Sequence, residues 1–232
     1  MSIPVAQCPP RNGFPALEVV LATSEQELDQ LYRLRKQIYV DEMGIVAPEH
    51  PFVDGERLVD PYDAWSVNLV LLAAGRPAGS VRLTEARAGA LEIDAYTQAS
   101  ARCPEPEQAA EATRLMVSRQ LRGSSGSALL LFAMWKVLRS RCRYLLAAAK
   151  PGGLGAYYKH ACAAGMTVFP ERFEYGLTGC QYELILADTG TPLSPRRLAW
   201  RAWIETLALL SFQAPARGLD FVRSGRLTAL RA

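Results

Sequence analysis

Two short acidic motifs contain the side chains best suited to acid–base chemistry. Asp60 and Asp63 lie three residues apart, and Glu111 precedes Arg114 by the same spacing. A carboxylate that is buried in a cleft has a raised pKa and can serve as a general base near neutral pH. A simpler interpretation is open for each motif: Glu111 would form a salt bridge with Arg114, and the two aspartates would lie in a solvated loop.

Two arginines and an aromatic residue accompany these acids. Arg35 and Tyr39 are four residues apart on one face of an expected helix, and Arg82 lies in an expected strand. A charged side chain that faces a core or a cleft is costly unless it is paired. Pairing of both arginines with the acidic motifs would satisfy these charges, whereas the alternative is that both side chains extend to the surface.

A glycine- and serine-rich bend joins an expected strand to an expected helix between Met116 and Ser127. The start of a helix presents unpaired backbone N–H groups and the positive end of the helix dipole. Glycine lets an oxyanion approach the backbone, and guanidinium groups can bind it further. The bend lacks the GxxxxGK[ST] pattern, so it is either a different phosphate site or a polar turn with a serine cap. The candidate ligands are Arg119, Arg122, Gly123, Ser125 and Gly126.

Histidine and cysteine usage argues against metal and disulfide chemistry. His50 and His160 are the only histidines, so a multi-histidine metal centre is excluded and a Ser-His-Asp triad is disfavoured. The five cysteines are odd in number and form no CxxC pair, which indicates cytosolic thiols. We therefore expect no bound metal and a cytoplasmic protein.

Hydrophobic periodicity predicts the elements that must position these groups. The first dozen residues are expected to be loose, and residues 41–63 to form a long polar loop. Strands are expected at 17–22, 66–74, 78–85, 91–96, 112–118, 144–149, 166–169 and 180–187. Helices are expected at 23–40, 128–141 and 154–164. This order predicts an α/β (α+β) fold with a mixed, mostly antiparallel central sheet flanked by helices, and the missing GxGxxG turn argues against a dinucleotide-binding fold.

The last part of the chain differs in charge from the rest. Residues 191–232 contain seven arginines against two acids, a net of +5, whereas the whole chain has a net charge of +3. We expect residues 1–190 to form the core domain and residues 191–232 a basic C-terminal helical extension. Such asymmetry suggests an acidic partner, but not nucleic acid, because no reading motif is present. The longest uncharged run, residues 123–135, is too short for a transmembrane segment.

The order and spacing of the charged residues resemble the acyl-homoserine lactone (autoinducer) synthases and the related long-chain N-acyl amino acid synthases. Both belong to the Gcn5-related N-acyltransferase superfamily. Their pattern is an arginine and an aromatic on the first helix, two acids three apart, an arginine in a strand and a Glu-x-x-Arg motif. The matching residues in this sequence are Arg35, Tyr39, Asp60, Asp63, Arg82, Glu111 and Arg114.

The resemblance implies an acyl-CoA N-acyltransferase-like fold without a tightly bound cofactor. It implies transfer of a fatty acyl group from a phosphopantetheine thioester to an amine. Glu111 would accept the proton of the amine, with Asp63 as the second candidate, and Tyr158 would protonate the leaving thiolate. The thioester would lie along Met116, Val117 and Ser118, with its phosphate on the bend. The substrate amine would bind among Arg35, Tyr39, Asp60, Arg82 and Arg114.

The donor and the amine have more than one candidate. Ile45 stands where the lactone synthases usually carry a tryptophan that seats S-adenosylmethionine, which favours an amino acid or a similar small amine as the acceptor. The basic extension favours an acidic acyl carrier protein as the donor. The alternatives are a lactone synthase that uses S-adenosylmethionine, an acyltransferase that uses coenzyme A, and a non-catalytic carrier-binding or scaffolding protein.

Overall fold

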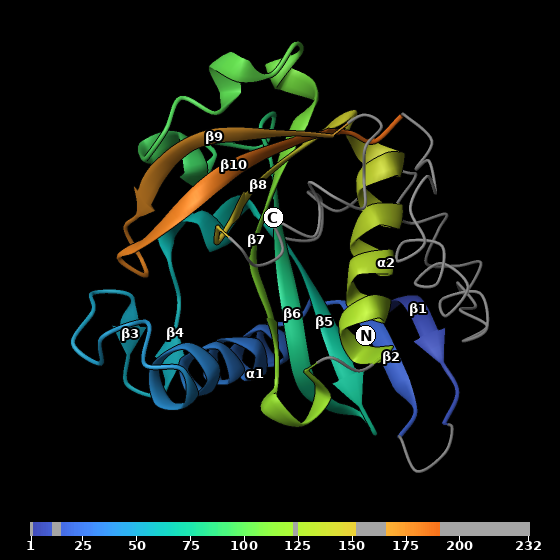
Figure 1. Ribbon diagram of the computed structural model, residues 1–232. Coiled ribbons are helices and arrows are strands. Elements are labelled where there is room, and N and C mark those ends of the chain that lie inside the picture. Colours follow the sequence, from blue (N-terminus) through green and yellow to red (C-terminus); the bar gives the residue numbers. More distant parts are fainter. Residues whose placement is uncertain (1, 11–14, 123–124, 152–165, 191–232) are drawn as a thin grey trace.

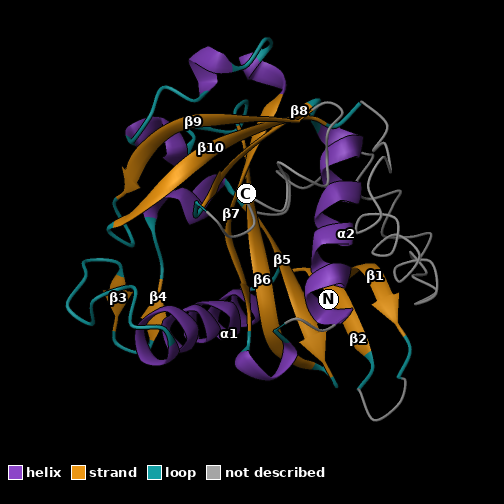
Figure 2. Ribbon diagram, viewed as in Figure 1, coloured by secondary structure: helices purple, strands orange, loops and turns teal. Residues whose placement is uncertain are grey.

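An eight-stranded sheet forms the centre of the structure (Figures 1 and 2). The computed structural model describes residues 2–10, 15–122, 125–151 and 166–190. The strand order is β1-β2-β5-β6-β7-β8-β10-β9, and every neighbouring pair is antiparallel apart from β7 and β8, which are parallel. The strands of this sheet are β1 (Ile3–Cys8), β2 (Leu17–Leu21), β5 (Val67–Ala73), β6 (Arg76–Glu85), β7 (Ala109–Val117), β8 (Tyr144–Ala149), β9 (Met166–Tyr175) and β10 (Cys180–Asp188).

Two α-helices flank this sheet in the described part of the chain, which confirms the predicted fold class. They are α1 (Glu25–Lys36) and α2 (Ser125–Arg141). Ser24 caps α1 and forms a capping box with Glu27, and the helix continues as a π-helix over Gln37–Glu42. No described helix is long and apolar enough to cross a membrane. The predicted helix at 154–164 and the predicted C-terminal helix lie outside the described residues.

Both edge strands depart from the sequence prediction, and a proline explains each error. β1 contains Pro4 in a segment that we expected to be loose, and it pairs with β2. β9 contains Pro170 and continues to Tyr175 instead of ending at residue 169. An edge strand has a partner on one side only, so it tolerates the missing N–H of proline.

Two connections also differ from the prediction. Residues 41–63 are not a plain loop, because they contain the hairpin of β3 (Val53–Asp54) and β4 (Arg57–Leu58) and lead into the 3₁₀ helix Pro61–Trp65. Residues 91–96 were predicted to be a strand and form the 3₁₀ helix Glu92–Ala95 instead. The alternation of apolar and acidic residues there imitates a half-buried strand, but Glu92 is as buried as Ile93.

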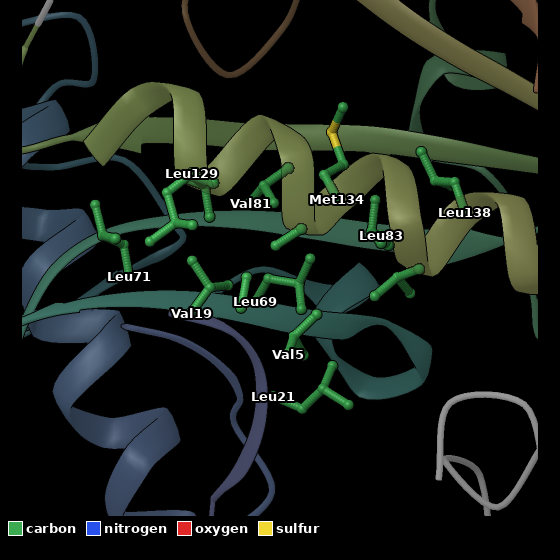
Figure 3. Close-up of a cluster of buried hydrophobic side chains, with 14 of the residues drawn as sticks. Val5, Val19, Leu21, Leu69, Leu71, Val81, Leu83, Leu129, Met134 and Leu138 are labelled. Carbon is green, nitrogen blue, oxygen red and sulfur yellow. The ribbon is translucent and has the colours of Figure 1, made fainter. Parts of the chain in front are cut away.

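The two helices cover opposite faces of the sheet. α2 packs on β1, β2, β5, β6 and β7, and α1 packs on β6 from the other side. Side chains of β5 alternate accordingly, since Leu69 and Leu71 belong to the core under α2 and Val70 to the core under α1. Figure 3 shows Leu129, Met134 and Leu138 of α2 against the strand residues below them. We call the opposite side of the sheet the α1 face.

A β-bulge in β7 turns one additional side chain toward the α1 face. Ser80 pairs with Met116 and Arg82 with Thr113, so two residues of β7 oppose one residue of β6. Arg114 occupies the bulge with a φ of +54°, in the left-handed region. Strict alternation would place Arg114 on the α2 side with Ala110 and Ala112. The bulge instead places it on the α1 face.

β7 and β8 separate partway along their length. Their parallel register runs from Ala109 and Tyr144 to Ala112 and Ala147. Beyond this point β7 continues beside β6 to Val117, and β8 continues beside β10. The backbone of β7 after Ala112 is therefore no longer paired with β8, which frees one side of the strand from sheet pairing.

Gly79 lets β6 approach β7 beside the bulge. A Cβ added at Gly79 would lie 2.8 Å from the Met116 carbonyl oxygen. We expect Gly79→Ala to displace β7 and to lower the free energy of unfolding by about 1–3 kcal/mol, measured by urea denaturation. Gly190→Ala is the control, because in the described part of the chain its Cβ would meet only the side-chain oxygen of Asp188 at 3.1 Å. Equal midpoints for both variants would contradict the close approach.

Candidate functional site

Arg35 is held by two side chains on the α1 face. Its Nη1 donates to both carboxylate oxygens of Asp63 at 2.8 Å, and its Nη2 donates to Asn68 Oδ1 at 2.6 Å. Arg35 comes from the last turn of α1 and Asn68 from β5, so these contacts fix the helix against the sheet. The pairing of Arg35 with an acidic motif is confirmed.

The first acidic motif is a buried capping box and not a solvated loop. Asp60 precedes the 3₁₀ helix, and its Oδ1 accepts a hydrogen bond from Tyr62 N at 3.0 Å. Asp63 Oδ2 accepts a hydrogen bond from Asp60 N at 3.1 Å. Asp60 is 6% exposed and Asp63 is 3% exposed. Because Asp63 is bound by Arg35 and by this N–H, its carboxylate holds the site together and is poorly placed to act as a base.

Asp60 joins two further arginines. Its Oδ1 also accepts from Arg82 Nη1, and its Oδ2 accepts from Arg114 Nε at 3.1 Å and Nη2 at 2.6 Å. Arg82 Nε donates to Thr113 Oγ1 at 3.0 Å. β6, β7 and the 3₁₀ helix Pro61–Trp65 are thereby linked through one carboxylate. The bulge is what brings Arg114 to this carboxylate.

Glu92 completes the group, although it was not among the site residues predicted from the sequence. Its Oε2 accepts from Arg82 Nη2, and its Oε1 accepts from Arg114 Nη2 at 2.8 Å. The side chain is fully buried. We call the six ionised side chains the arginine cluster; they are Arg35, Arg82, Arg114, Asp60, Asp63 and Glu92.

The arginine cluster balances three positive charges against three negative ones. Burial alone would raise the pKa of Asp60, but Arg114, Arg82 and Arg35 outweigh it and hold that pKa below its ordinary value. Burial would lower the pKa of Arg114, but Glu92 and Asp60 raise it well above its ordinary value. Both groups therefore stay ionised throughout the neutral range.

Glu111 is a fourth buried carboxyl group beside this balanced cluster. Its Oε1 accepts a hydrogen bond from Ile93 N at 3.1 Å and from the Tyr175 hydroxyl at 3.4 Å. Its Oε2 is buried and has no hydrogen-bond partner among the described residues. Burial and then the charge of Glu92 raise the pKa of Glu111 to about 7, against the lowering effect of Arg82. Arg114 pairs with Asp60 and Glu92, so the predicted alternative of a Glu111–Arg114 salt bridge is wrong.

Tyr39 lies one turn after Arg35 and is 8% exposed. Burial raises the pKa of its phenol, while the charges of Arg114, Arg35 and Arg82 act in the opposite direction. The structure therefore places Tyr39 next to the arginine cluster. Together with this tyrosine, the cluster contains all five predicted substrate-binding residues.

The predicted phosphate bend begins where β7 ends. Met116 and Val117 are buried, Ser118 is half-buried, and Arg119 is exposed. Arg122 braces the bend, because its Nε donates to the Val117 carbonyl oxygen at 3.0 Å and its Nη2 pairs with Glu42 at 3.1 Å. This leaves Arg119 as the arginine of the bend with no ion pair to another described residue.

The remaining predicted positions are only partly described. α2 begins at Ser125, and Gly126 is buried in its first turn. Gly123 and Tyr158 lie outside the described residues. Within the described ranges, no group of three or more histidine, cysteine, aspartate or glutamate side chains could hold a metal ion.

Sequence reasoning missed three buried polar residues, each with a weak signal. Asn68 sits within an apolar run, where a polar residue is costly unless it is bonded, and Glu92 is flanked by Leu91 and Ile93. Tyr175 lies beyond Pro170, at which the predicted strand ended too early. Their partners are distant in sequence, so the residue types alone gave no reason to join them to Glu111 or to the arginines.

The arrangement supports one kind of chemistry. Glu111 is about half ionised near neutral pH and can accept a proton. The separation of β7 from β8 frees backbone groups that could bind a developing oxyanion near Met116. The solvent-exposed Arg119 can bind an anion at the end of the same strand.

Comparison with known proteins points in the same direction. Residues 34–132 match the family model described as the acetyltransferase (GNAT) domain. This segment contains all six residues of the arginine cluster, Glu111 and the bend. No curated protein matches the chain.

Solved structures share the fold at low sequence identity. MesI, a CoA-dependent acyl-homoserine lactone synthase, has a TM-score of 0.59 and 18% identity over 81% of this chain and 94% of its own. BjaI, a CoA-dependent acyl-homoserine lactone synthase solved with SAM and isopentyl-CoA, has a TM-score of 0.57 and 18% identity over 97% of this chain and 100% of its own. FeeM, an N-acyl amino acid synthase from uncultured soil microbes, has a TM-score of 0.58 and 14% identity over 81% of this chain and 98% of its own.

The buried pair of Arg35 and Asp63 gives a prediction for stability. Asp63→Asn leaves the Arg35 charge uncompensated in the interior, so we expect the free energy of unfolding to fall by about 3–5 kcal/mol in urea denaturation. Asp29→Asn is the matched control, because Asp29 pairs with Arg33 on the same helix at the surface. Its midpoint should stay close to that of the wild type. Similar small effects of both variants would contradict a buried charge pair.

Glu111 gives a prediction for the pH dependence of stability. Its pKa is raised from 4.5 to about 7, so the folded state binds more protons and its stability falls as the pH rises through this window. Glu111→Gln does not titrate there. We expect the variant to gain stability relative to the wild type between these pH values, by at most about 3 kcal/mol. The measurement is the free energy of unfolding of both proteins across this pH range. Parallel pH profiles of the wild type and Glu111→Gln would rule out the raised pKa.

Proposed function

We propose that this chain, which carries an acetyltransferase (GNAT) domain, is an N-acyltransferase. It transfers a fatty acyl group from a phosphopantetheine thioester to the amine of an amino acid or a similar small molecule. The observation that carries the proposal is the position of Glu111, a buried carboxyl group with a pKa of about 7 on the strand that separates from β8. The matched family model and the shared fold support the same class of reaction.

The reaction needs a base, because an amine is protonated at neutral pH. The Glu111 carboxylate accepts a proton from the ammonium group, and the free amine attacks the thioester carbonyl carbon. The carbonyl oxygen becomes an oxyanion, which backbone N–H groups between Leu115 and Val117, on the side of β7 that no longer pairs with β8, stabilise. The C–N bond forms, the C–S bond breaks, and the nitrogen loses its second proton as the thiolate becomes a thiol. The products are an amide and free phosphopantetheine thiol.

The arginine cluster gives the acceptor site a fixed shape and little net charge. Its three guanidinium groups are already bound by three carboxylates, so the acceptor meets a polar wall without an unpaired arginine. This arrangement suits a small amine that uses hydrogen bonds, such as an amino acid. Asp63 braces Arg35 in this proposal, and Glu111 alone acts as the base.

The donor is held at the bend after β7. Arg119 binds the phosphate of the pantetheine arm, and Arg122 keeps the bend in place through Glu42. Coenzyme A and an acyl carrier protein both present this phosphate. The net charge of +5 in residues 191–232 favours the acidic carrier protein, whereas MesI and BjaI are CoA-dependent synthases. Assays with each donor separate the two.

A lactone synthase that uses S-adenosylmethionine is the second candidate. The observation that favours it is the shared fold with MesI and with BjaI, which was solved with SAM and isopentyl-CoA. Incubation of the purified chain with an acyl thioester and S-adenosylmethionine distinguishes the candidates. Release of methylthioadenosine would identify a lactone synthase, whereas N-acylated amino acids without its release would support the leading proposal.

The role of Glu111 predicts a loss of turnover. We expect Glu111→Gln to reduce acyl transfer by about 10²- to 10⁴-fold, followed by amine-dependent release of free thiol and by mass spectrometry of the product. Glu107→Gln is the control, because Glu107 is exposed just before the same strand. Near-normal turnover by Glu111→Gln would exclude this residue as the base. If the wild-type chain bound the acyl carrier protein but catalysed no acyl transfer, a scaffolding role would replace the enzymatic one.

The role of Arg119 predicts a change in donor affinity. Arg119→Ala should raise KM for the acyl thioester by about tenfold with little change in kcat, because one charge-assisted hydrogen bond to phosphate is lost. Arg139→Ala is the matched control, since Arg139 is exposed in the last turn of α2. Steady-state kinetics with each thioester provide the measurement. Equal KM values for the two variants would exclude Arg119 as a phosphate ligand.

A further inference from the structure

We propose that Tyr175 and Glu92 are positioning residues for Glu111. Tyr175 and the backbone N–H of Ile93 occupy Oε1, so that the proton is exchanged at Oε2, while Glu92 binds the two arginines that would otherwise pair with Glu111. The inference rests on the proposed function for its role in acyl transfer. Its structural part can be tested without any substrate.

The two oxygens of Glu111 have different surroundings. Oε1 accepts from Ile93 N at 3.1 Å and from the Tyr175 hydroxyl at 3.4 Å. Oε2 is buried and has no partner among the described residues. An ionised carboxylate oxygen that already accepts two hydrogen bonds is less basic than one that accepts none. The incoming proton is therefore bound at Oε2.

Tyr175 is held firmly at the end of β9. The residue is 4% exposed, and its ring packs against Tyr96 at 4.8 Å and against Tyr182 at 5.6 Å between centroids. A Cβ at the next residue, Gly176, would lie 2.7 Å from the Tyr96 ring. Burial, followed by the charges of Glu111 and Glu92, raises the pKa of Tyr175 far above its ordinary value. The phenol therefore keeps its proton and acts only as a donor to Oε1.

Glu92 keeps the neighbouring arginines away from Glu111. Its two oxygens bind Arg82 and Arg114, two described arginines whose charges lower the pKa of Glu111. An ion pair with either arginine would leave Glu111 permanently ionised and weakly basic. The next residue, Ile93, donates its N–H to Glu111, so one 3₁₀ helix supplies both effects.

Among the described residues, titratable or charged groups from five elements act on Glu111. They are Tyr62 of the 3₁₀ helix Pro61–Trp65, Arg82 of β6, Glu92 of the 3₁₀ helix Glu92–Ala95, Arg114 of β7 and Tyr175 of β9. Only Tyr175 contributes a side-chain hydrogen bond to the Glu111 carboxyl group among the described residues. The removal of Tyr175 or of Glu92 should therefore move the titration of Glu111 in opposite directions.

The test is a carboxyl titration of the full chain without substrate. Protein labelled with ¹³C at glutamate side chains is titrated by NMR, and Glu111→Gln assigns the signal. Tyr175→Phe removes a donor to the carboxylate, so the apparent pKa of Glu111 should rise by about half a unit. Glu92→Gln removes a negative neighbour and frees the arginines, so the apparent pKa should fall by about one unit or more. Tyr182→Phe is the control, because its hydroxyl contacts Thr178 Oγ1 at 3.2 Å.

The outcomes separate this inference from the proposed function. Opposite shifts for the two variants, with none for Tyr182→Phe, support the inference even if acyl transfer is never detected. Unchanged titrations, or shifts in one direction, overturn it even if the enzyme is active. If Glu92→Gln does not fold, the comparison of Tyr175→Phe with Tyr182→Phe decides: a raised apparent pKa of Glu111 in Tyr175→Phe alone supports the inference, and equal values overturn it. In the active enzyme, Tyr175→Phe should also shift the acidic limb of the pH profile of kcat to higher pH. A loss of packing alone would not cause this shift.

Discussion

The burial of three guanidinium groups against three carboxylates is the constraint on which the site depends. Ions leave water at a cost that only close, complementary pairing offsets. Each member of the arginine cluster therefore needs the others, and they come from α1, β6, β7 and two 3₁₀ helices. The cluster consequently holds together elements that are far apart in sequence. It also leaves Glu111 as a carboxyl group without a countercharge of its own.

Several local features of the backbone serve this pairing. The bulge places Arg114 on the α1 face at the expense of a left-handed φ of +54°. The capping box aims Asp60 at two arginines while Asp63 holds Arg35. The same stretch of β7 that carries the bulge lies beyond its pairing with β8. One short segment of β7 therefore contains the strained residue Arg114, the backbone that is unpaired with β8, and Glu111. Backbone strain of this kind is typical of functional sites.

The sequence carried enough information for the fold class and for most members of the site. Hydrophobic periodicity located every strand of the eight-stranded sheet except β1, because apolar alternation reports which side of an element is buried. It missed the short β3–β4 hairpin and added a false strand at 91–96. Six of the charged residues were identified by their order and spacing, which resemble the pattern of the autoinducer and N-acyl amino acid synthases. Glu92 was not identified, since it looks like a solvent-facing residue in an alternating pattern. Its burial is decided by two arginines that the chain brings together only on folding.

The details that escaped prediction are those set by the tertiary structure. The β-bulge decides whether Glu111 pairs with Arg114 or stays apart from it. The residue types of Glu-Ala-Thr-Arg at 111–114 do not predict a bulge in that strand. The capping box was visible in Asp60-Pro61-Tyr62-Asp63, because an acid three residues after an aspartate N-cap and a proline at the first position are its signature. That motif could have predicted that the two aspartates cap a helix and do not lie in a plain loop.

The most direct measurement is the pH dependence of kcat/KM for acyl transfer in the wild type and in Glu111→Gln. If Glu111 is the free carboxyl group that the arginine cluster leaves over, the wild-type rate should fall below an apparent pKa near 7, and this limb should be absent from the residual activity of the variant. An acidic limb that persists unchanged in Glu111→Gln would contradict the account, because the titrating base would then be a different group.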